Sequence, residues 1–475
     1  MNAYNFNPSY SYKKLPSIFY HDQTPLAFDQ ASYVLFNHDL ARALKLNIDA
    51  LKSEAGIKFI LGHHETLTPL SMAYAGHQYG NFTLLGDGRA HLIMEHTIND
   101  KRYDIHLKGS GPTVYSRGFD GRATLRSALL EYMISTALDA LNVPTTKALA
   151  VIQTGDKINR IGLKHAAILV RVAQSHLRVG TFEYAVYKGS DTYLKPLVDY
   201  AIKRHDDDLL SQSNLYIKWY KRVIKRQAKL IALWQSIGFV HGVMNTDNMT
   251  ISGETIDFGP CAFIDQYDLK SVYSSIDTFG RYAYGNQPYI ASWNLAKLGQ
   301  MILPLVSEDK SDAIKKVQDA LETFSSHFEN TYYEIMGKKL GFHLKNKEDV
   351  ALIDTLLSIM EKHQADYTET FVGLSYQEDT LALFKQDDFI KWKATWLARI
   401  KEEKLAYETM KKTNPVIIPR NHIVKKLLDQ VSETLDFTSL KEYLHYLKNP
   451  YDITVPIDYR TKSPSNETFI TYCGT

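Results

Sequence analysis

Asn248 and Asp257 are oxygen-bearing residues whose types and spacing suit a magnesium ion. Mg²⁺ takes oxygen ligands in near-octahedral geometry, usually one or two from protein and the rest from phosphate and water. Asp257 opens the tripeptide Asp257-Phe-Gly, and Asn248 ends the run His241-Gly-Val-Met-Asn-Thr-Asp-Asn248. The pattern predicts a metal–triphosphate site with Asn248 and Asp257 as ligands, and Mn²⁺ satisfies the same ligand types.

This order of residues resembles the metal-binding half of a protein-kinase active site. Kinases place a catalytic aspartate shortly before the metal-binding Asn, but this sequence has Val243 at that position. Asp247 stands beside Asn248 instead, which makes it the candidate proton acceptor for a hydroxyl group. The alternative is that Asp247 only caps a loop. We expect the chain to handle a nucleoside triphosphate differently from a kinase.

Lys108 and Glu131 form a second candidate pair. Glu131 lies on the apolar stripe of a helix predicted over Thr124–Leu141, where an unpaired carboxylate would be costly. Lys108 ends a strand predicted over Tyr103–Lys108 and is the natural cation to meet it. In kinases such a pair holds the ATP phosphates through the lysine. The alternative is a helix-edge Glu and a solvated Lys.

A glycine-rich turn and two arginines are candidate phosphate ligands. The segment Gly86-Asp-Gly-Arg89 is predicted to form the tip of a hairpin, where glycine permits close backbone approach and Arg89 adds a fork of donors. Arg171 and Arg178 flank a histidine inside a mostly apolar segment. Arginines so placed suit phosphate oxygens, although surface ion pairs are the commoner fate of a single arginine.

The elements that must position these residues divide the chain into a strand-rich first part and a helical second part. Further strands are predicted near Lys147–Ile152 and Ala166–Val172. The later helices are predicted over Tyr216–Ile237, Ser292–Leu303, Ser311–Met336, Lys347–Tyr367, Asp388–Thr409 and His422–Thr434. The first 75 residues carry few periodic signals. The expected fold class is α+β with two lobes.

Composition excludes several kinds of protein. A hydrophobic content of 44% over 475 residues is enough for a large core, and a net charge of +2 gives no sign of a nucleic-acid or membrane partner. The start of the chain lacks the basic and apolar run of a secretory signal, and no apolar stretch approaches the roughly 20 residues of a membrane span. We expect a soluble cytoplasmic protein.

Six sequence blocks resemble the selenoprotein O family, also called the YdiU family. They are Ala75-Gly-His-Gln-Tyr-Gly80, Leu85-Gly-Asp-Gly-Arg89, Leu107-Lys-Gly-Ser-Gly-Pro112, Asp120-Gly-Arg-Ala123, His241-Gly-Val-Met-Asn-Thr-Asp-Asn248 and Thr255-Ile-Asp-Phe-Gly-Pro260. The resemblance covers nearly the whole chain. It implies a protein-kinase-like, bilobal fold with a strand-rich N-lobe, a helical C-lobe and extra terminal elements. The expected divisions are 1–75, 76–195, 196–345 and 346–475.

The resemblance also implies an activity. Members bind ATP reversed relative to kinases and transfer AMP to protein hydroxyl groups of Ser, Thr or Tyr; UMP transfer is also attributed to the family. Asp247 is then the proton acceptor, and Asn248 and Asp257 hold Mg²⁺ or Mn²⁺. The implied nucleotide contacts, with Glu131 in support, are Gly86, Gly88, Arg89, Lys108, Asp120, Gly121, Arg171, Arg178 and Asp257.

Two cysteines occur, Cys261 and Cys473, which excludes a disulfide framework and favours a reducing compartment. Eukaryotic members of the family often carry selenocysteine third from the C-terminus, where this chain has Cys473. We hypothesise a reversible bond between Cys473 and Cys261 that restrains the active-site loop. The alternative is that Cys261 is a small buried filler.

Three functions are therefore compared. The first is a protein adenylyltransferase. The second is a phosphotransferase that keeps the ordinary ATP pose, against which Val243 argues because that chemistry places its aspartate there. The third is a silent nucleotide-binding regulator, against which the complete set of metal ligands and the Lys–Glu pair argue.

Overall fold

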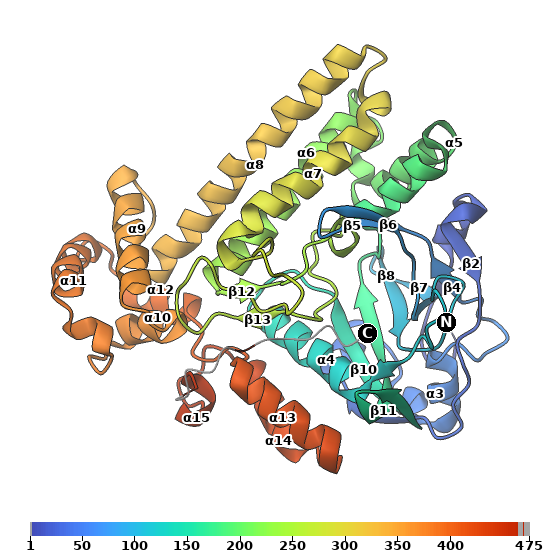
Figure 1. Cartoon of the computed structure of the whole chain (residues 1–475), viewed down its shortest axis with the longest axis horizontal. Helices are drawn as coiled ribbons and strands as arrows, with labels where there is room; N and C mark the ends of the chain where they lie inside the picture. Colours follow the sequence, from blue (N-terminus) through green and yellow to red (C-terminus); the bar gives the residue numbers. More distant parts are fainter. Residues whose placement is uncertain (1, 464–468, 470–475) are drawn as a thin grey trace.

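The chain is an α+β protein, as predicted, with its strands mainly in the first half and helices dominating the second (Figure 1). The computed structural model describes residues 2–463 and Phe469. Within this described part, no helix is long and apolar enough to cross a bilayer.

Nine strands of the described residues form one antiparallel sheet with the central order β2–β4–β7–β8–β11–β10–β3. β1 pairs with β7, and β9 pairs with β11. The strands are β1 (Pro8–Ser9), β2 (Tyr20–Asp22), β3 (Ser32–Phe36), β4 (Leu70–Met72), β7 (Ala90–Ile98), β8 (Lys101–Lys108), β9 (Ala123–Thr124), β10 (Lys147–Arg160) and β11 (Gly162–Ala173). Two small sheets pair β5 (Ala75–Gln78) with β6 (Asn81–Leu84) and β12 (Phe239–Val240) with β13 (Ala262–Phe263).

The sheet register places two predicted phosphate ligands on one face. Arg171 on β11 lies opposite His106 on β8, and Lys108 follows His106 by two residues. Cross-strand partners share a face, and so do residues two apart along a strand. Lys108 and Arg171 therefore point to the same side, where helix α4 (Leu125–Ala140) packs against β10 and β11. The predicted helix over Thr124–Leu141 is confirmed, and the Thr124 side chain caps it.

The predicted hairpin with its tip at Gly86-Asp-Gly-Arg89 is wrong. β6 pairs with β5, and β7 pairs with β8, so the segment connects two different sheets. The Asp87 side chain turns inward, and its Oδ2 accepts hydrogen bonds from the Met72 amide and from His106 Nε2, both at 3.1 Å. Alternating apolar residues on either side of an Asp-Gly pair predict strands but do not show which strand pairs with which.

The first 75 residues are more structured than their sequence indicates. Besides β1 to β4 they form the short helices α1 (His38–Ala43), α2 (Ile48–Lys52) and α3 (Glu54–Ile60). The side chains of Asn37, Asn47 and Ser53 cap them. Helices of so few residues complete less than two turns and therefore show little periodicity.

Four long helices follow the sheet: α5 (Val179–His205), α6 (Leu215–Ser236), α7 (Gln287–Val306) and α8 (Lys310–Lys339). The helices predicted at 216–237, 292–303 and 311–336 are confirmed, although α7 begins five residues earlier. Helix α5 was not predicted as such, because Gly180, Gly189 and Pro196 interrupt its sequence pattern. Gly189 has a φ of 135° and kinks the helix.

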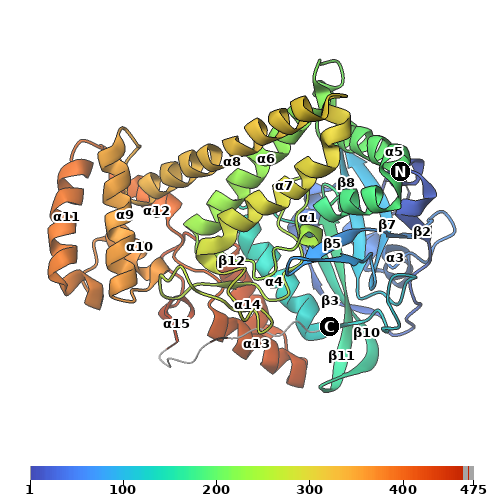
Figure 2. The same cartoon turned by 45° about the horizontal axis from the view of Figure 1, so that its top comes forward.

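The last third of the chain contains α9 (Lys347–Lys362), α10 (Tyr367–Tyr376), α11 (Asp387–Ile400), α12 (Ala406–Thr413), α13 (Asn421–Thr434), α14 (Thr438–Leu447) and α15 (Ile457–Arg460). Helices α9 to α12 gather at the C-terminal end of α8, away from the sheet, while α13 and α14 pack on α4 (Figure 2). The helix predicted at 422–434 is confirmed.

Two predicted helices in this region are wrong in extent: the first continues past the end of α9 at Lys362, and the second joins two helices. The prediction over Lys347–Tyr367 is broken at Gln364, whose φ is 49°, and Asp366 caps the next helix by accepting from the Glu369 amide at 2.9 Å. The prediction over Asp388–Thr409 is broken between α11 and α12. An apolar stripe that continues across a break hides the break from sequence.

Candidate active site

The structure brings Lys108 and Glu131 together at the interface of the sheet and α4. Lys108 Nζ contacts Glu131 Oε1, and the Glu131 side chain is almost fully buried. Glu131 Oε2 also accepts from Arg171 Nη2 at 2.8 Å. Lys108 at the end of β8 and Glu131 on the inward face of α4 therefore pair, as their sequence patterns predict.

Asp257 lies at the centre of the same cluster. Its Oδ1 is 2.8 Å from Lys108 Nζ and 2.7 Å from Arg171 Nη2. Its Oδ2 is 2.6 Å from Arg178 Nη1. β8, β11 and the start of α5 therefore place their cations on a single carboxylate that lies 79 to 149 residues away in the chain.

Electrostatics keep this cluster ionised. Burial opposes the charge on Asp257, but the fields of Lys108, Arg171 and Arg178 outweigh it and hold the pKa of Asp257 well below its usual value. Burial likewise opposes the charge on Glu131, and the same Lys108 and Arg171 lower its pKa. Three cations face the carboxylates of Asp257 and Glu131, and Asp87 adds a further negative field at Arg178. Lysine and arginine side chains gathered in this way are the donors that bind phosphate oxygens.

A buried histidine supports the loop that carries Asp257. The φ of Asp257 is 63°, a backbone conformation that non-glycine residues adopt rarely. The preceding carbonyl, of Ile256, lies 2.8 Å from Nε2 of His241, which is fully buried. Burial also lowers the pKa of His241. His241 therefore supports the loop and does not face the cavity described below.

Asn248 lies in the short 3-10 turn Thr246–Asn248, beside Asp247. Its Nδ2 donates to the Val243 carbonyl at 3.0 Å, which leaves Oδ1 as the free acceptor of the amide. An amide oxygen and an ionised Asp257 are hard oxygen donors that fit Mg²⁺ or Mn²⁺. Within the described residues, no group of three or more His, Cys, Asp or Glu is arranged to hold a metal. When a divalent ion binds, Asn248 and Asp257 are the residues of this site that would hold it, with phosphate and water completing its shell.

Asp247 is a buried carboxylate with an unused oxygen. Its Oδ1 has no hydrogen-bond partner among the described residues, and its backbone oxygen accepts from Arg178 Nη1 at 2.6 Å. Burial raises the pKa of Asp247 to about 7, against the opposing field of Arg178. Gly76 and Gly180 back it closely, because a Cβ at either position would collide with Asp247 or with the neighbouring backbone. The side chain is thus fixed from behind.

A cavity of about 580 Å³ opens in front of Asp247. Its wall contains six of the predicted site residues, which are Gly86, Gly88, Arg89, Asp120, Gly121 and Asp247. Tyr74 joins this wall to the charged cluster, since the Arg178 guanidinium lies 4.7 Å from the centre of its ring. Lys108, Arg171, Asp257 and Asn248 do not line the cavity themselves; the cluster lies behind its Asp247 side.

Asp120 and Gly121 both line the cavity, but the Asp120 side chain already has a partner. The Asp120 carboxylate is bound by Arg160 in a two-point ion pair, at 2.8 and 2.9 Å, and Arg160 lowers its pKa. Gly121 packs directly on the backbone of Gly111, where a Cβ would not fit. The acidic side chain is therefore already paired, and the backbone of this loop is the part that remains open to a ligand.

Sequence reasoning missed several residues that shape the site. Gln78 and Arg160 line the cavity, and Glu183 connects α5 to the turn Thr246–Asn248 and to β5. Glu183 Oε2 accepts from Thr246 Oγ1 at 2.6 Å, and its Oε1 lies 2.6 Å from His77 Nδ1. The only sequence signal for Gln78 and His77 was their place in the Ala75–Gly80 block.

The hypothesis of a bond between the two cysteines stays a prediction, because Cys473 lies outside the described residues. Cys261 is buried, and its thiol donates to the Phe258 carbonyl at 3.3 Å. Burial raises the pKa of Cys261, which disfavours the reactive thiolate. Two free thiols in the mass of unreduced, mildly oxidised protein would contradict the hypothesis.

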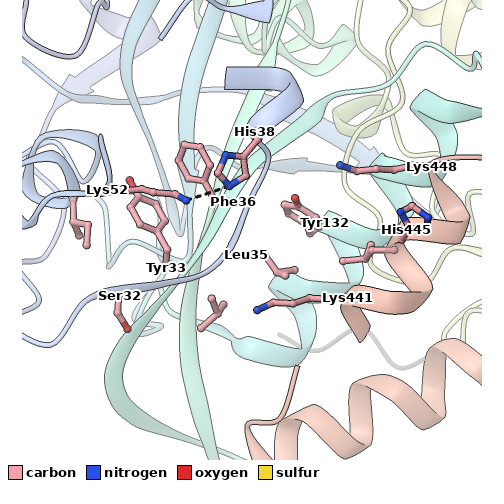
Figure 3. Close-up of a pocket in the computed structure, with 13 residues that line it drawn as sticks. Ser32, Tyr33, Leu35, Phe36, His38, Lys52, Tyr132, Lys441, His445 and Lys448 are labelled. Atoms are coloured by element: carbon pink, nitrogen blue, oxygen red, sulfur yellow. Dashed lines mark hydrogen bonds between the residues drawn. The ribbon is translucent and has the colours of Figure 1, made fainter. Parts of the chain in front are cut away.

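Another large cavity lies away from these residues. It measures about 670 Å³ and lies between β3, α4 and α14 (Figure 3). Lysines 52, 441 and 448 stand at its rim, and Tyr33, Phe36 and Tyr132 line its wall. It contains none of the predicted site residues and no carboxylate among its lining residues. It is therefore separate from the site that the sequence predicts.

A buried cluster of cations that suits phosphate groups lies beside a cavity lined by Asp247. This is the arrangement expected of a nucleotide-dependent transferase. Residues 2–448 match the family described as "Protein adenylyltransferase SelO". The chain therefore belongs to the SelO family of protein adenylyltransferases, as its sequence blocks predicted. Members of this family use ATP as the substrate that supplies AMP.

Relatives of similar length agree with this assignment. The chain is 47% identical to "Protein nucleotidyltransferase YdiU" of Bacillus thuringiensis subsp. konkukian (strain 97-27), covering 100% of this chain and 99% of the relative. It is 48% identical to the protein of that name from Bacillus mycoides (strain KBAB4), with the same coverage. The corresponding Clostridium perfringens protein (strain ATCC 13124) is 46% identical over 99% of this chain and 98% of its own length. The chain is thus a protein nucleotidyltransferase.

Proposed function

We propose that this enzyme transfers AMP from ATP to Ser, Thr or Tyr hydroxyl groups of other proteins, with the triphosphate bound tail inward. One observation carries the proposal. Asp257 is held by three cations, one of which, Arg178, also binds the Asp247 backbone, and Asp247 lines the open cavity. Terminal phosphates directed at these cations would leave the α-phosphate next to Asp247.

The chemistry follows from that orientation. The acceptor hydroxyl oxygen attacks the α-phosphorus, and its proton passes to the Asp247 carboxylate. The bond from the α-phosphorus to the oxygen that bridges it to the β-phosphorus breaks, and pyrophosphate leaves with the electron pair. Lys108, Arg171 and Arg178 neutralise the charge that develops on the departing group. A divalent ion on Asn248 and Asp257, when bound, would screen the phosphate oxygens.

The proposal includes a protein-kinase-like arrangement of two lobes, divided as 1–75, 76–195, 196–345 and 346–475. Its support is the chain order of the strand lysine, the helix glutamate and the two metal ligands, together with the contact of Lys108 with both Glu131 and Asp257. Val243 at the position of the kinase aspartate, and Asp247 facing the cavity, favour nucleotidyl transfer over phosphoryl transfer.

Labelled ATP tests the proposal. Incubation with Mg²⁺ and acceptor protein should place label from the α-phosphate on protein, and none from the γ-phosphate. Protein label from the γ-position alone would establish the phosphotransferase instead. Absence of both would leave a nucleotide-binding regulator. The Asp257→Ala variant serves as the blank for each reaction.

A further inference from the structure

A groove of about 750 Å³ lies next to the nucleotide cavity. The β5–β6 turn forms one wall, and the segment 276–281, which follows Asp257-Phe258-Gly259, forms the other with the start of α7. Gln78 lines both the groove and the cavity, and Asp247 lines the cavity beside it. A polypeptide in the groove would therefore place its next residues at the carboxylate proposed to accept the proton.

The groove presents apolar side chains to solvent. Phe279 is 98% exposed, Tyr289 68% and Ile276 54%. Large apolar groups gathered on a surface mark interaction sites, whereas single ones are ordinary. These three line one groove, and nothing in the described chain covers them.

The two charged residues of the groove differ in how far other groups of the chain pair with them. The Asp277 carboxylate accepts from the backbone amides of Arg281 and Tyr282, at 2.8 and 2.7 Å. The Arg281 guanidinium lies 4.8 Å from the ring centre of Trp293 and makes no ion pair with a carboxylate among the described residues. The groove thus offers a cation beside an apolar surface, which complements a carboxylate next to an apolar side chain.

The floor of the groove is firmly held. The Tyr79 amide donates to Asn245 Oδ1 at 3.1 Å, and the Tyr282 hydroxyl donates to the same oxygen at 2.6 Å. Tyr79 also shares a hydrogen bond of 3.2 Å with Ser274. A preformed groove binds an extended segment without first paying for its own ordering.

We propose that this groove is the docking site for the acceptor protein. Its occupant is an extended segment that carries an apolar or aromatic residue and a carboxylate on one side of the modified hydroxyl residue. Phe279 and Ile276 take the apolar side chain, Arg281 takes the carboxylate, and Gln78 marks the passage to Asp247. The inference rests on the proposed transfer of AMP and names the acceptor that the same site selects.

The test uses a peptide library with a central Ser, Thr or Tyr, randomised flanks, and ATP labelled at the α-phosphate. The wild-type enzyme should enrich peptides with the apolar–acidic pattern. The double variant Phe279→Ser, Ile276→Ser should lose the apolar selection and raise the acceptor KM about tenfold or more, a loss of roughly 1.4 kcal/mol. Arg281→Met should lose only the acidic selection.

Controls separate docking from folding and from nucleotide binding. Leu405→Ser removes an exposed leucine in the α11–α12 connection (68% exposed) and should change neither selection nor KM. ATP affinity should be equal in all variants. The acceptor KM of each variant relative to that of the wild type is also measured with the proteins of a cell extract as acceptors. Label without apolar selection, or selection unchanged in the double variant, would overturn the docking site alone; no α-label on any acceptor would overturn the transfer as well.

Discussion

Arg178 and Asp257 are joined by a hydrogen bond of 2.6 Å from Nη1 to Oδ2. The same Nη1 donates to the backbone oxygen of Asp247, also at 2.6 Å. One arginine therefore spans the residue proposed to hold the metal and the residue proposed to take the proton. The geometry of the site therefore depends on the planar shape of this guanidinium as well as on its charge.

Arg178→Lys tests that dependence. A lysine keeps the charge but is a single point donor, and it cannot reproduce the planar fork or the contact with the Tyr74 ring. We expect transfer to fall by about 10- to 100-fold, which corresponds to the loss of one to two charge-assisted hydrogen bonds. Initial rates with α-labelled ATP measure this. A lysine variant with the wild-type rate would reduce Arg178 to a source of charge.

Asp257→Ala should abolish transfer, because it removes a metal ligand and the centre of the cation cluster. Leaving Lys108, Arg171 and Arg178 with Glu131 alone should also destabilise the fold by about 3–5 kcal/mol, as breaking a buried pair does. Asp257→Asn is the matched variant of equal size. Transfer is measured beside a melting curve. Normal transfer by either variant with Mg²⁺ present would contradict the metal assignment.

Asp247→Asn should lower turnover by about 10²- to 10⁴-fold while ATP affinity stays near its wild-type value. The amide has the same shape and still fits against Gly76 and Gly180, but it cannot accept the proton. Single-turnover rates and equilibrium ATP binding separate the two effects. An unchanged rate would make Asp247 a loop residue.

Lys339 gives a prediction about stability and pH. It is fully buried, its Nζ lies 4.3 Å from the ring centre of Phe371, and burial lowers its pKa to about 7. The unfolded chain titrates near 10.4, so between pH 7 and about 10 it binds more protons than the folded chain. The contribution of Lys339 to stability therefore becomes more favourable as pH rises through this window. Below pH 7 the free-energy cost of burying the charged lysine is present in full.

Lys339→Met removes that penalty. The variant should be more stable than wild type at pH 6, by up to about 4 kcal/mol, and the advantage should shrink toward pH 10. Melting temperatures at the two pH values measure it. Lys338→Met is the matched control, because Lys338 is exposed and should show no such dependence. Equal advantages at both pH values would contradict the lowered pKa.

The pairing of Lys108 with Glu131 was predictable because both halves have local signatures. A glutamate on an apolar helical stripe needs a cation, and the preceding strand ends in one. The helix α4 and the strands β8, β10 and β11 follow from periodicity for the same reason. The positions of Asn248 and Asp257 followed from a motif, and the structure adds which atoms remain free.

Other features depend on contacts between distant segments and have no local signature. The sequence around Gln78 does not reveal that this residue lines both the nucleotide cavity and the neighbouring groove. Arg160 ends an ordinary strand, and its pairing with Asp120 depends on how the long β10–β11 hairpin bends over the loop. The breaks at Gln364 and after Ile400 interrupt apolar stripes that continue on both sides.

Asn245 stands two residues before Asp247, and its single oxygen joins Tyr79 of the β5–β6 turn to Tyr282 beyond the Asp-Phe-Gly segment. None of the three segments can shift without stretching one of these bonds. An acceptor segment in the groove would therefore lie against a wall that is tied, through one amide oxygen, to the peptide leading into Asp247.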